Sequence, residues 1–161
     1  MVLALALTAE LIGVTSLRPL DDASNPFSYT FKVQCTSCRE THPNFVTLNR
    51  HETHEQSGSR GEANFVWKCK NCKREHSANI KAPPVPYEQS EPPKRVNILE
   101  FDCRGLEFLE FKPEGEFLAT GIESNTPFTG IDLSEGEWYE YDEKAGEEVS
   151  IKEVKWEIRR A

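Results

Sequence analysis

The sequence predicts an all-β fold, either a barrel or a sandwich, and three observations support this. Short segments in which apolar and other residues alternate recur along the 161 residues, a pattern typical of half-buried strands. Turn signals such as Pro113-Glu114-Gly115 and Ala145-Gly146 separate these segments. No stretch has the 3.6-residue apolar period of a long amphipathic helix. Many short strands punctuated by turns are typical of barrels and sandwiches.

The expected strands follow from the apolar pattern in chain order. In the first part of the chain we expect strands at 3–11, 27–35, 44–48, 64–69 and 76–80. In the second part we expect strands at 96–103, 106–111, 116–121, 137–141 and 149–158. The alternation in the last of these changes phase near Glu153, which indicates a β-bulge.

The apolar N-terminus is interpreted as a strand rather than a signal peptide. No basic residue precedes Arg18, and Thr8 and Glu10 interrupt the apolar run, whereas a signal peptide has a basic start and a continuous apolar core. Its larger side chains alternate with smaller ones, which suits a half-buried strand. We therefore expect no cleaved signal, a reducing compartment and a cytoplasmic location. No apolar run is long enough for a membrane helix.

Charge divides the chain into two unlike parts. The formal net charge is −8. Residues 1–82 contain ten Lys and Arg against eight Asp and Glu, while 83–161 contain nine against nineteen. Five prolines lie within 83–95, which predicts a stiff, extended connector. We therefore predict a first β half at 1–82, a connector at 83–95 and an acidic β half at 96–161. The charge disfavours a protein that grips nucleic-acid phosphates.

The two halves have the pattern of a diverged repeat. Residues 29–35 and 97–103 are both expected strands that run into a cysteine, and more strands and a late tryptophan follow each. In such a repeat Cys103 is the counterpart of Cys35, and the second half has lost its CxxC pairs.

The other four cysteines form two CxxC pairs, Cys35-Thr-Ser-Cys38 and Cys69-Lys-Asn-Cys72. Two intervening residues make a tight knuckle that aims both sulfurs at one point, and two knuckles close a tetrahedron around Zn²⁺. Such a four-cysteine site leaves no open position for water, which favours a structural role. Basic residues near the knuckles would offset its negative charge: Arg39, Lys68, Lys70, Lys73 and Arg74. We therefore predict one Zn²⁺ on Cys35, Cys38, Cys69 and Cys72.

Other metal and thiol chemistries remain alternatives. A redox CxxC pair requires a βαβ setting and only one pair. His51-Glu-Thr-His54 has a spacing that a second metal site could use, although a polar loop is the simpler setting; His42 and His76 are further spare donors. Cys103 is either a nucleophile whose pKa Arg104 lowers or a small apolar side chain at a strand end.

An ordered set of motifs resembles the eukaryotic CXXC-motif-containing zinc-binding protein family. Besides the two CxxC pairs, the matching stretches are Ser16-Leu-Arg-Pro19, Gly58–Ala63, Glu100–Glu107, Gly121–Phe128 and Tyr141–Ala145. The resemblance implies one zinc on the four CxxC cysteines. It also implies two similar barrel-like halves packed together, with metal in the N-terminal half only. The family brings no established catalytic activity.

The expected function is that of a non-enzymatic zinc-binding protein, either a protein-interaction adaptor or a metal-homeostasis factor. We expect a monomer that binds a protein partner, with a metal-handling protein as one candidate, and neither nucleic acid nor membrane. The acidic run 135–148, with Trp138, Tyr139 and Tyr141, is either an interaction face or a solvated surface. The alternative is an oxidoreductase like the zinc-containing methionine sulfoxide reductases, with Cys103 as nucleophile. No catalytic residue is assigned under the first hypothesis.

Overall fold

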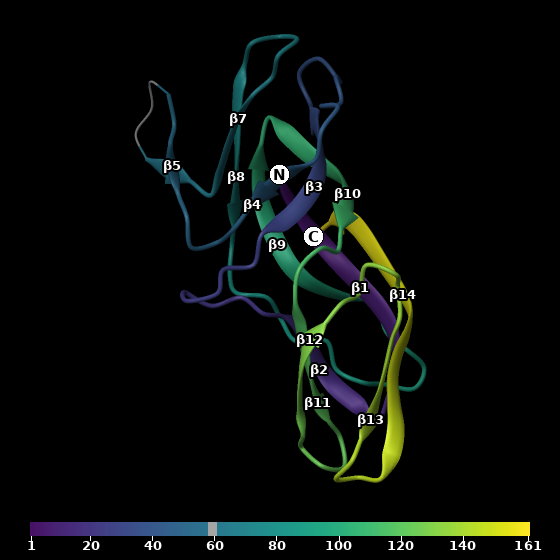
Figure 1. Cartoon of the computed structure of the whole chain (residues 1–161). Helices are drawn as coiled ribbons and strands as arrows, with labels where there is room; N and C mark the ends of the chain where they lie inside the picture. The colour runs from purple at the N-terminus through teal and green to yellow at the C-terminus, as the bar shows by residue number, and fades with distance from the viewer. Residues whose placement is uncertain (58–60) are drawn as a thin grey trace.

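The structure is a computed structural model that describes residues 1–57 and 61–161. Every regular element in these ranges is a β-strand (Figure 1), which confirms the all-β prediction. The strands are β1 (Val2–Ile12), β2 (Val14–Pro19), β3 (Tyr29–Cys35), β4 (Val46–Leu48), β5 (His54–Glu55), β6 (Glu62–Ala63), β7 (Phe65–Lys68), β8 (Glu75–Ile80), β9 (Val96–Arg104), β10 (Leu106–Lys112), β11 (Phe117–Gly121), β12 (Pro127–Ile131), β13 (Trp138–Asp142) and β14 (Glu147–Arg160). The first three residues of the Gly58–Ala63 motif lie outside the described residues. The described ranges contain no helix that could cross a membrane.

The largest sheet has β1 near its centre. Its order is β13-β14-β1-β9-β8-β7, and β1 pairs antiparallel with β14 on one side and β9 on the other. The two termini meet on this sheet (Figure 1), where the Ala161 amide donates to the carbonyl of Val2 at 3.2 Å. Strands from the two ends of the chain therefore form one continuous structure.

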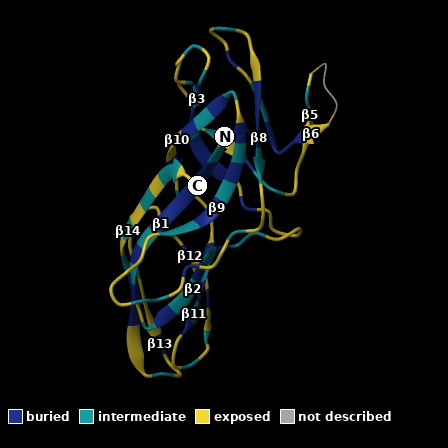
Figure 2. Ribbon diagram, turned by 180° about the vertical axis from the view of Figure 1, so that it is seen from behind, coloured by how far each residue is buried: buried dark blue, intermediate teal, exposed yellow. Residues whose placement is uncertain are grey.

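The central position of β1 corrects one expectation. Leu3, Leu5 and Leu7 are buried as the alternation predicts, but Ala4 and Ala6 between them are also buried, at 0% and 1% exposure. A strand with neighbours on both edges and cover on both faces buries both sets of side chains. Figure 2 shows β1 dark blue along most of its length. The prediction of a half-buried strand was wrong because small alanines, rather than polar residues, fill the second face.

Two three-stranded sheets exchange strands between the halves. One has the order β10-β3-β4 and the other β12-β11-β2. Thus β10, from the second half, pairs with β3, and β2, from the first half, pairs with β11. The sequence boundaries at 82 and 96 stay a prediction, but the strands of the two ranges are interlocked. A separate ribbon, β5-β6, completes the described strands.

The sheet orders have an approximate twofold relationship. If β1, β2, β3, β4, β7 and β8 are matched with β9, β10, β11, β12, β13 and β14, every pairing in the three larger sheets maps onto another. The two strand-to-strand corners agree, since Gly13 joins β1 to β2 and Gly105 joins β9 to β10, with φ of 76° and 81°. The two halves are therefore similar, as the repeat hypothesis expected.

This relationship corrects the expected partner of Cys103. Cys103 pairs with Ala78 across β9 and β8, whereas Leu11 pairs with Ile151 across β1 and β14. Cys103 thus corresponds to Leu11, since each lies near the end of one of the two central strands of the largest sheet, and not to Cys35 on β3. The two cysteine-terminated stretches looked alike because each ends an apolar strand, which does not fix the strand's place in a sheet.

Aromatic side chains fill the core in two groups, one around Phe31 and one around Trp156. Phe31 stacks on Phe108 with ring centroids 4.4 Å apart and meets Phe101 edge-on at 5.1 Å. Trp156 contacts Phe111 and Phe117, with centroids 4.8 and 5.9 Å away. Offset and edge-on aromatic pairs contribute packing energy beyond their buried area. Because β10 carries Phe108 and Phe111, the exchanged strand links the two aromatic groups.

Two local predictions concern the last strand and the connector. Glu153 has a φ of 53°, and the β1–β14 register shifts opposite it, between Thr8 and Glu10, which confirms the predicted bulge. The connector has no regular strand but is anchored, because Tyr87 is 1% exposed and exchanges backbone hydrogen bonds with Leu17 at 2.8 and 2.9 Å.

Candidate metal centre

The first CxxC pair forms a tight turn at the end of β3. The Arg39 amide donates to the carbonyl of Cys35 at 2.9 Å, and the Cys35 amide donates to the carbonyl of Glu40 at 3.0 Å. Arg39 has a φ of 65°, a left-handed conformation that is costly for any residue with a Cβ. This turn brings Cys38 back beside Cys35, as a knuckle requires.

The second pair repeats this geometry after β7. The Lys73 amide donates to the carbonyl of Cys69 at 2.9 Å, and the Cys69 amide donates to the carbonyl of Arg74 at 2.9 Å. Lys73 has a φ of 66°. Two different sequences therefore adopt one turn geometry, which points to a shared constraint on where their sulfurs lie.

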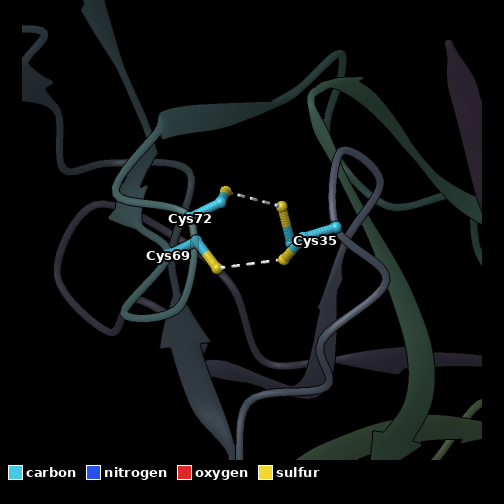
Figure 3. A group of neighbouring side chains, drawn as sticks. Cys35, Cys69 and Cys72 are labelled. Carbon is cyan, nitrogen blue, oxygen red and sulfur yellow. Dashed lines mark hydrogen bonds between the residues drawn. The ribbon is translucent and has the colours of Figure 1, made fainter.

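The two knuckles face each other across a small gap. Figure 3 shows Cys35, Cys69 and Cys72 with their sulfurs directed toward one another. The sulfur of Cys35 lies 3.6 Å from that of Cys72, and the sulfur of Cys38 lies 3.6 Å from that of Cys69. All four sulfurs lie within 4.8 Å of one another. The structure thus brings together all four residues that the sequence predicts as metal ligands.

These distances fit a tetrahedral thiolate metal. With Zn–S bonds of about 2.3 Å, adjacent sulfurs of a regular tetrahedron lie about 3.8 Å apart. The two 3.6 Å separations are close to this edge and are too long for S–S bonds. None of the five cysteines forms a disulfide. Four thiolates at tetrahedral spacing are a donor set that favours Zn²⁺ over Mg²⁺ or Ca²⁺.

The surroundings of the knuckles act differently on two of the thiols. Hydrogen bonds with the Asn71 side chain and the Glu40 backbone lower the pKa of the Cys38 thiol to about 6. The Arg74 backbone lowers the pKa of Cys72, but burial and the neighbouring cysteines outweigh it and raise this pKa to about 11. Metal binding requires deprotonated sulfur, and the contacts at Cys38 favour that form.

His76 lies directly behind the cluster. Its Nε2 atom is 3.1 Å from the sulfur of Cys35, and its ring is buried. With the proton on Nε2, the ring donates an N–H···S bond to Cys35, the kind of outer contact that orients a metal ligand. On the other side of the ring, a Cβ on Gly105 would lie 2.0 Å from Nδ1. The sequence offered His76 only as a spare ligand and gave no signal for this contact.

The remaining histidines do not join the cluster. His51 Nε2 lies 3.1 Å from a carboxylate oxygen of Asp21, and His54 Nε2 lies 3.8 Å from one of Glu52. The His42 ring packs edge-on against Trp67. Within residues 1–57 and 61–161, the four cysteines are the one group with metal-binding spacing. The alternative second site at His51 and His54 therefore has no support in the described chain.

The basic residues near the knuckles are solvent-exposed. Their positions are Arg39, Lys68, Lys70, Lys73 and Arg74. The Arg74 guanidinium lies 3.4 Å from the Ser37 hydroxyl, which ties the second knuckle to the first. Arg39 lies 3.4 Å from Glu107 on β10. These charges lie within or beside the two knuckles in the chain, where they would offset the formal −2 of four thiolates with Zn²⁺.

Cys103 lies apart from the cluster, in the core. It is 2% exposed, and its burial raises the pKa of the thiol to about 12. Its backbone amide donates to the carbonyl of Met1 at 2.8 Å. A thiol that stays protonated and lacks access to solvent is a poor nucleophile, so the apolar interpretation of Cys103 fits its surroundings.

Comparisons with known proteins agree with this geometry. Residues 4–159 match the family described as "CXXC motif containing zinc binding protein, eukaryotic". UPF0587 protein C2D10.03c of Schizosaccharomyces pombe is 51% identical over 98% of each chain. A human protein called "CXXC motif containing zinc binding protein" is 39% identical over 94% of each chain.

Solved structures share the fold along the whole chain. The crystal structure of C1orf123 has a TM-score of 0.91 and 37% identity over 100% of each chain. A hypothetical protein from Plasmodium falciparum has a TM-score of 0.86 at 22% identity over 99% of each chain, which shows the fold alone. Since the family match spans nearly every residue and the four CxxC sulfurs converge, this chain belongs to the eukaryotic CXXC motif containing zinc binding protein family.

Proposed function

We propose that this protein is a non-enzymatic zinc-binding protein that holds one structural Zn²⁺. The observation that carries the proposal is the convergence of Cys35, Cys38, Cys69 and Cys72, whose sulfurs all lie within 4.8 Å of one another. Four protein ligands leave no coordination position for water or substrate, which favours a structural metal. The metal would clamp the end of β3 to the end of β7, two strands that do not pair with each other.

Metal stoichiometry and release rate test this role. We expect one zinc per purified chain, and loss of that zinc together with a lower melting temperature in Cys69→Ala. A chelator should remove zinc slowly, at the rate at which the two knuckles unfold locally, because metal binding and folding are coupled. Cys103→Ala, which removes a thiol outside the cluster, is the matched control and should retain one zinc. A Cys69→Ala variant that keeps its zinc and melting temperature would refute the structural role.

The rate of release also distinguishes the metal-transfer variant of this function. Cys35 and Cys69 are buried, while Cys38 and Cys72 are half-buried. A transferable zinc would leave a chain that stays folded, and its release would be faster than hydrogen exchange at the backbone amides of the knuckles. Slow release at the rate of local opening supports the structural role instead.

The acidic second half supplies a surface for a protein partner. A hollow of about 500 Å³ lies against the edge strand β13. Its lining combines apolar, aromatic and charged side chains: Ile12, Tyr139, Glu140, Tyr141, Glu148, Val149, Ser150 and Lys152. Tyr139 and Tyr141 are 60% and 50% exposed, and exposed tyrosines are enriched in binding surfaces. We propose that this face makes the protein an adaptor.

Charge and strand geometry limit what the partner presents. Glu140 and Glu148 line the hollow with one opposing Lys152, so a basic segment is complementary. The hollow lies over the neighbouring strands β1, β14 and β13, and the free edge of β13 beside it offers unpaired backbone groups that can accept an extended segment. The proposed occupant is therefore an extended, Lys- or Arg-containing segment of another protein, with a metal-handling protein as one candidate. The acidic surface opposes binding to phosphate, whether in nucleic acid or on a lipid.

Site-specific crosslinking tests this surface. A photo-reactive amino acid at Tyr139 should crosslink to a partner peptide rich in Lys and Arg, and Glu140→Lys with Glu148→Lys should abolish the product. The same amino acid at Val85, which is 51% exposed, is the control position. Equal yields of crosslinked product from positions 139 and 85, or crosslinks mainly to acidic peptides, would contradict the proposal.

The oxidoreductase alternative has less support. Burial and a raised pKa argue against Cys103 as a nucleophile, and no His lies in 83–161. In the native protein, Cys103 should resist alkylation that proceeds freely after unfolding. Methionine sulfoxide turnover that disappears in Cys103→Ser would establish the alternative. Free thiols and a metal bound by thiolates suit a reducing compartment, so we propose a cytoplasmic location. We also propose that the protein is a monomer.

A further inference from the structure

The turn after β11 has the backbone geometry of the first CxxC knuckle. The Asn125 amide donates to the carbonyl of Gly121 at 3.0 Å, and the Gly121 amide donates to the carbonyl of Thr126 at 2.8 Å. Asn125 has a φ of 58°, close to the 65° of Arg39. Residues 121–126 therefore correspond to residues 35–40, with Gly121 in the place of Cys35 and Ser124 in the place of Cys38.

The turn after β13 has the geometry of the second knuckle. The Gly146 amide donates to the carbonyl of Asp142 at 2.8 Å, and Gly146 has a φ of 67°, against 66° for Lys73. The strand pairs match as well, because Trp138 lies opposite Ile151 as Phe65 lies opposite Ala78. Asp142 therefore stands in the place of Cys69, and Ala145 in the place of Cys72.

Contacts outside the turns support the same correspondence. The amides of Thr36 and Ile122 donate to the carbonyls of Gly105 and Gly13, at 3.0 and 2.9 Å. A Cβ on Gly13 would lie 2.6 Å from the Val149 side chain, just as one on Gly105 would strike His76. Gly121 and Asp142 are buried while Ser124 and Ala145 are half-buried, the burial order of the four cysteines.

A carboxylate occupies the point at which the second pair of turns meets. Asp142 accepts hydrogen bonds from the Ser124 hydroxyl, from the Thr126 hydroxyl at 3.3 Å and from the Ala145 amide at 3.1 Å. Its Oδ2 would lie 2.7 Å from a Cβ on Gly121. The Ser124–Asp142 bond spans the same two positions as the 3.6 Å contact between Cys38 and Cys69.

We propose that Gly121, Ser124, Asp142 and Ala145 form a metal-free counterpart of the zinc centre, in which the Asp142 carboxylate clamps the two turns in place of a metal. The backbone keeps the shape of a four-thiolate site, so it would bind a soft divalent cation such as Zn²⁺ if cysteines stood at the four positions. The assignment of the metal to the first pair rests on the proposed function, whereas the Asp142 clamp does not. It follows that metal removal loosens one end of the molecule and leaves the other end intact.

A four-cysteine variant tests the latent site. Gly121→Cys, Ser124→Cys, Asp142→Cys and Ala145→Cys are introduced together, since the Ser124 and Asp142 atoms that crowd a Cβ at position 121 are then replaced. We expect two zinc ions per folded chain, against one in the parent protein. A folded variant, judged by circular dichroism, that still binds one zinc would overturn the correspondence.

Hydrogen exchange of the single variants provides a second test that does not require the four-cysteine protein to fold. Asp142→Ala should speed exchange at the amides of Asn125 and Gly146 and leave those of Arg39 and Lys73 protected. Removal of zinc from the parent protein with a chelator should speed exchange at the amides of Arg39 and Lys73 and leave those of Asn125 and Gly146 protected. Asp132→Ala, which removes an exposed turn aspartate that accepts from the Ser134 amide, is the control and should change neither pair.

The outcomes separate this inference from the proposed function. Chelation that deprotects both pairs equally, or Asp142→Ala that leaves Asn125 and Gly146 protected, would overturn the clamp. A parent protein that binds no zinc but responds to Asp142→Ala as expected would refute the zinc proposal and leave the clamp standing.

Discussion

The Nε2 atom of His76 lies 3.1 Å from the sulfur of Cys35, while the opposite side of the same ring faces Gly105. The ring therefore fills the space between a metal ligand and the corner that joins β9 to β10. Because β10 pairs with β3, the strand that carries Cys35, the four-cysteine cluster adjoins a strand from the other half of the chain.

Loss of the His76 side chain should weaken zinc binding without unfolding the chain. In His76→Val the N–H···S bond disappears, and the fold should tolerate valine because Val149 occupies the corresponding position beside Gly13. We expect the zinc affinity to fall roughly 10- to 100-fold, as for other outer contacts of metal ligands. Competition with a zinc-binding dye measures this. The control is His54→Val, whose ring is 51% exposed, and equal affinities in the two variants would count against the contact.

Alanine at Gly105 should be far more damaging than alanine at a geometrically similar glycine. Gly105 and Gly136 have φ of 81° and 78°, but a Cβ at Gly136 meets nothing within 4 Å. The left-handed conformation alone should cost Gly136→Ala about 1 kcal/mol of unfolding free energy. Gly105→Ala adds a clash with His76, for a total loss of about 2–4 kcal/mol. Denaturant unfolding checks both, and equal losses would exclude the clash.

Glycine at the left-handed knuckle positions should stabilise the protein. The left-handed conformation costs Arg39 and Lys73 about 1–2 kcal/mol each, and glycine would relieve this strain. Glycine also gives the unfolded chain more freedom, which offsets about 0.4–1 kcal/mol of that gain. We expect Lys73→Gly to raise the free energy of unfolding by up to about 1.5 kcal/mol. Lys70→Gly, in the same knuckle without a positive φ, should lower it. Changes of the same sign in both variants would contradict the argument.

The Asp142 clamp should make stability depend on acidity. The Ser124 hydrogen bond, with those of Ala145 and Thr126, holds the pKa of Asp142 below its usual range. A depressed folded-state pKa means that its stabilisation is complete above the unfolded pKa of about 4 and is lost as pH falls through the folded value. The melting temperature of the parent should therefore exceed that of Asp142→Asn at neutral pH, with a difference that shrinks below about pH 4.

An exposed neighbour provides the control for this titration. Glu143 lies in the same turn and is exposed, so Glu143→Gln should melt as the parent does at neutral pH. A difference between parent and Asp142→Asn that stays constant down to about pH 2, well below the ordinary carboxyl range, would show that the carboxylate acts through shape rather than charge.

A buried carboxylate at Asp21 should anchor the loop between β4 and β5, which carries Arg50 and His51. Its side chain is 0% exposed and accepts from the Tyr29 hydroxyl at 2.8 Å and from Arg50 Nε at 3.1 Å. Removal of one partner of a buried ion pair costs about 3–5 kcal/mol, the loss in unfolding free energy that we expect for Asp21→Ala. Asp22→Ala, at the exposed neighbour, should cost about 1 kcal/mol. Equal losses on chemical unfolding would refute the anchor.

The ligand set could be predicted from the sequence, but its surroundings could not. Two CxxC pairs predict converging sulfurs because two intervening residues permit only a tight turn, and the structure brings these residues together. Nothing in the sequence around His76 or Gly105 indicates their contact, since the two residues meet only when β8 pairs with β9. The second pair of turns was missed for the same reason, because Gly121, Ser124, Asp142 and Ala145 share a backbone shape with the cysteines and not a chemistry.

The sequence by itself determined the all-β class, most strand positions, the bulge near Glu153 and the four cysteines that meet. These properties follow from local periodicity, from turn chemistry and from thiolate coordination, which all act over a few residues. The tertiary structure alone decided that β1 is buried on both faces, that β2 and β10 are exchanged and that Cys103 corresponds to Leu11. Strand order is set by packing between segments far apart in the chain, and a strand's own residues do not record which neighbour it has.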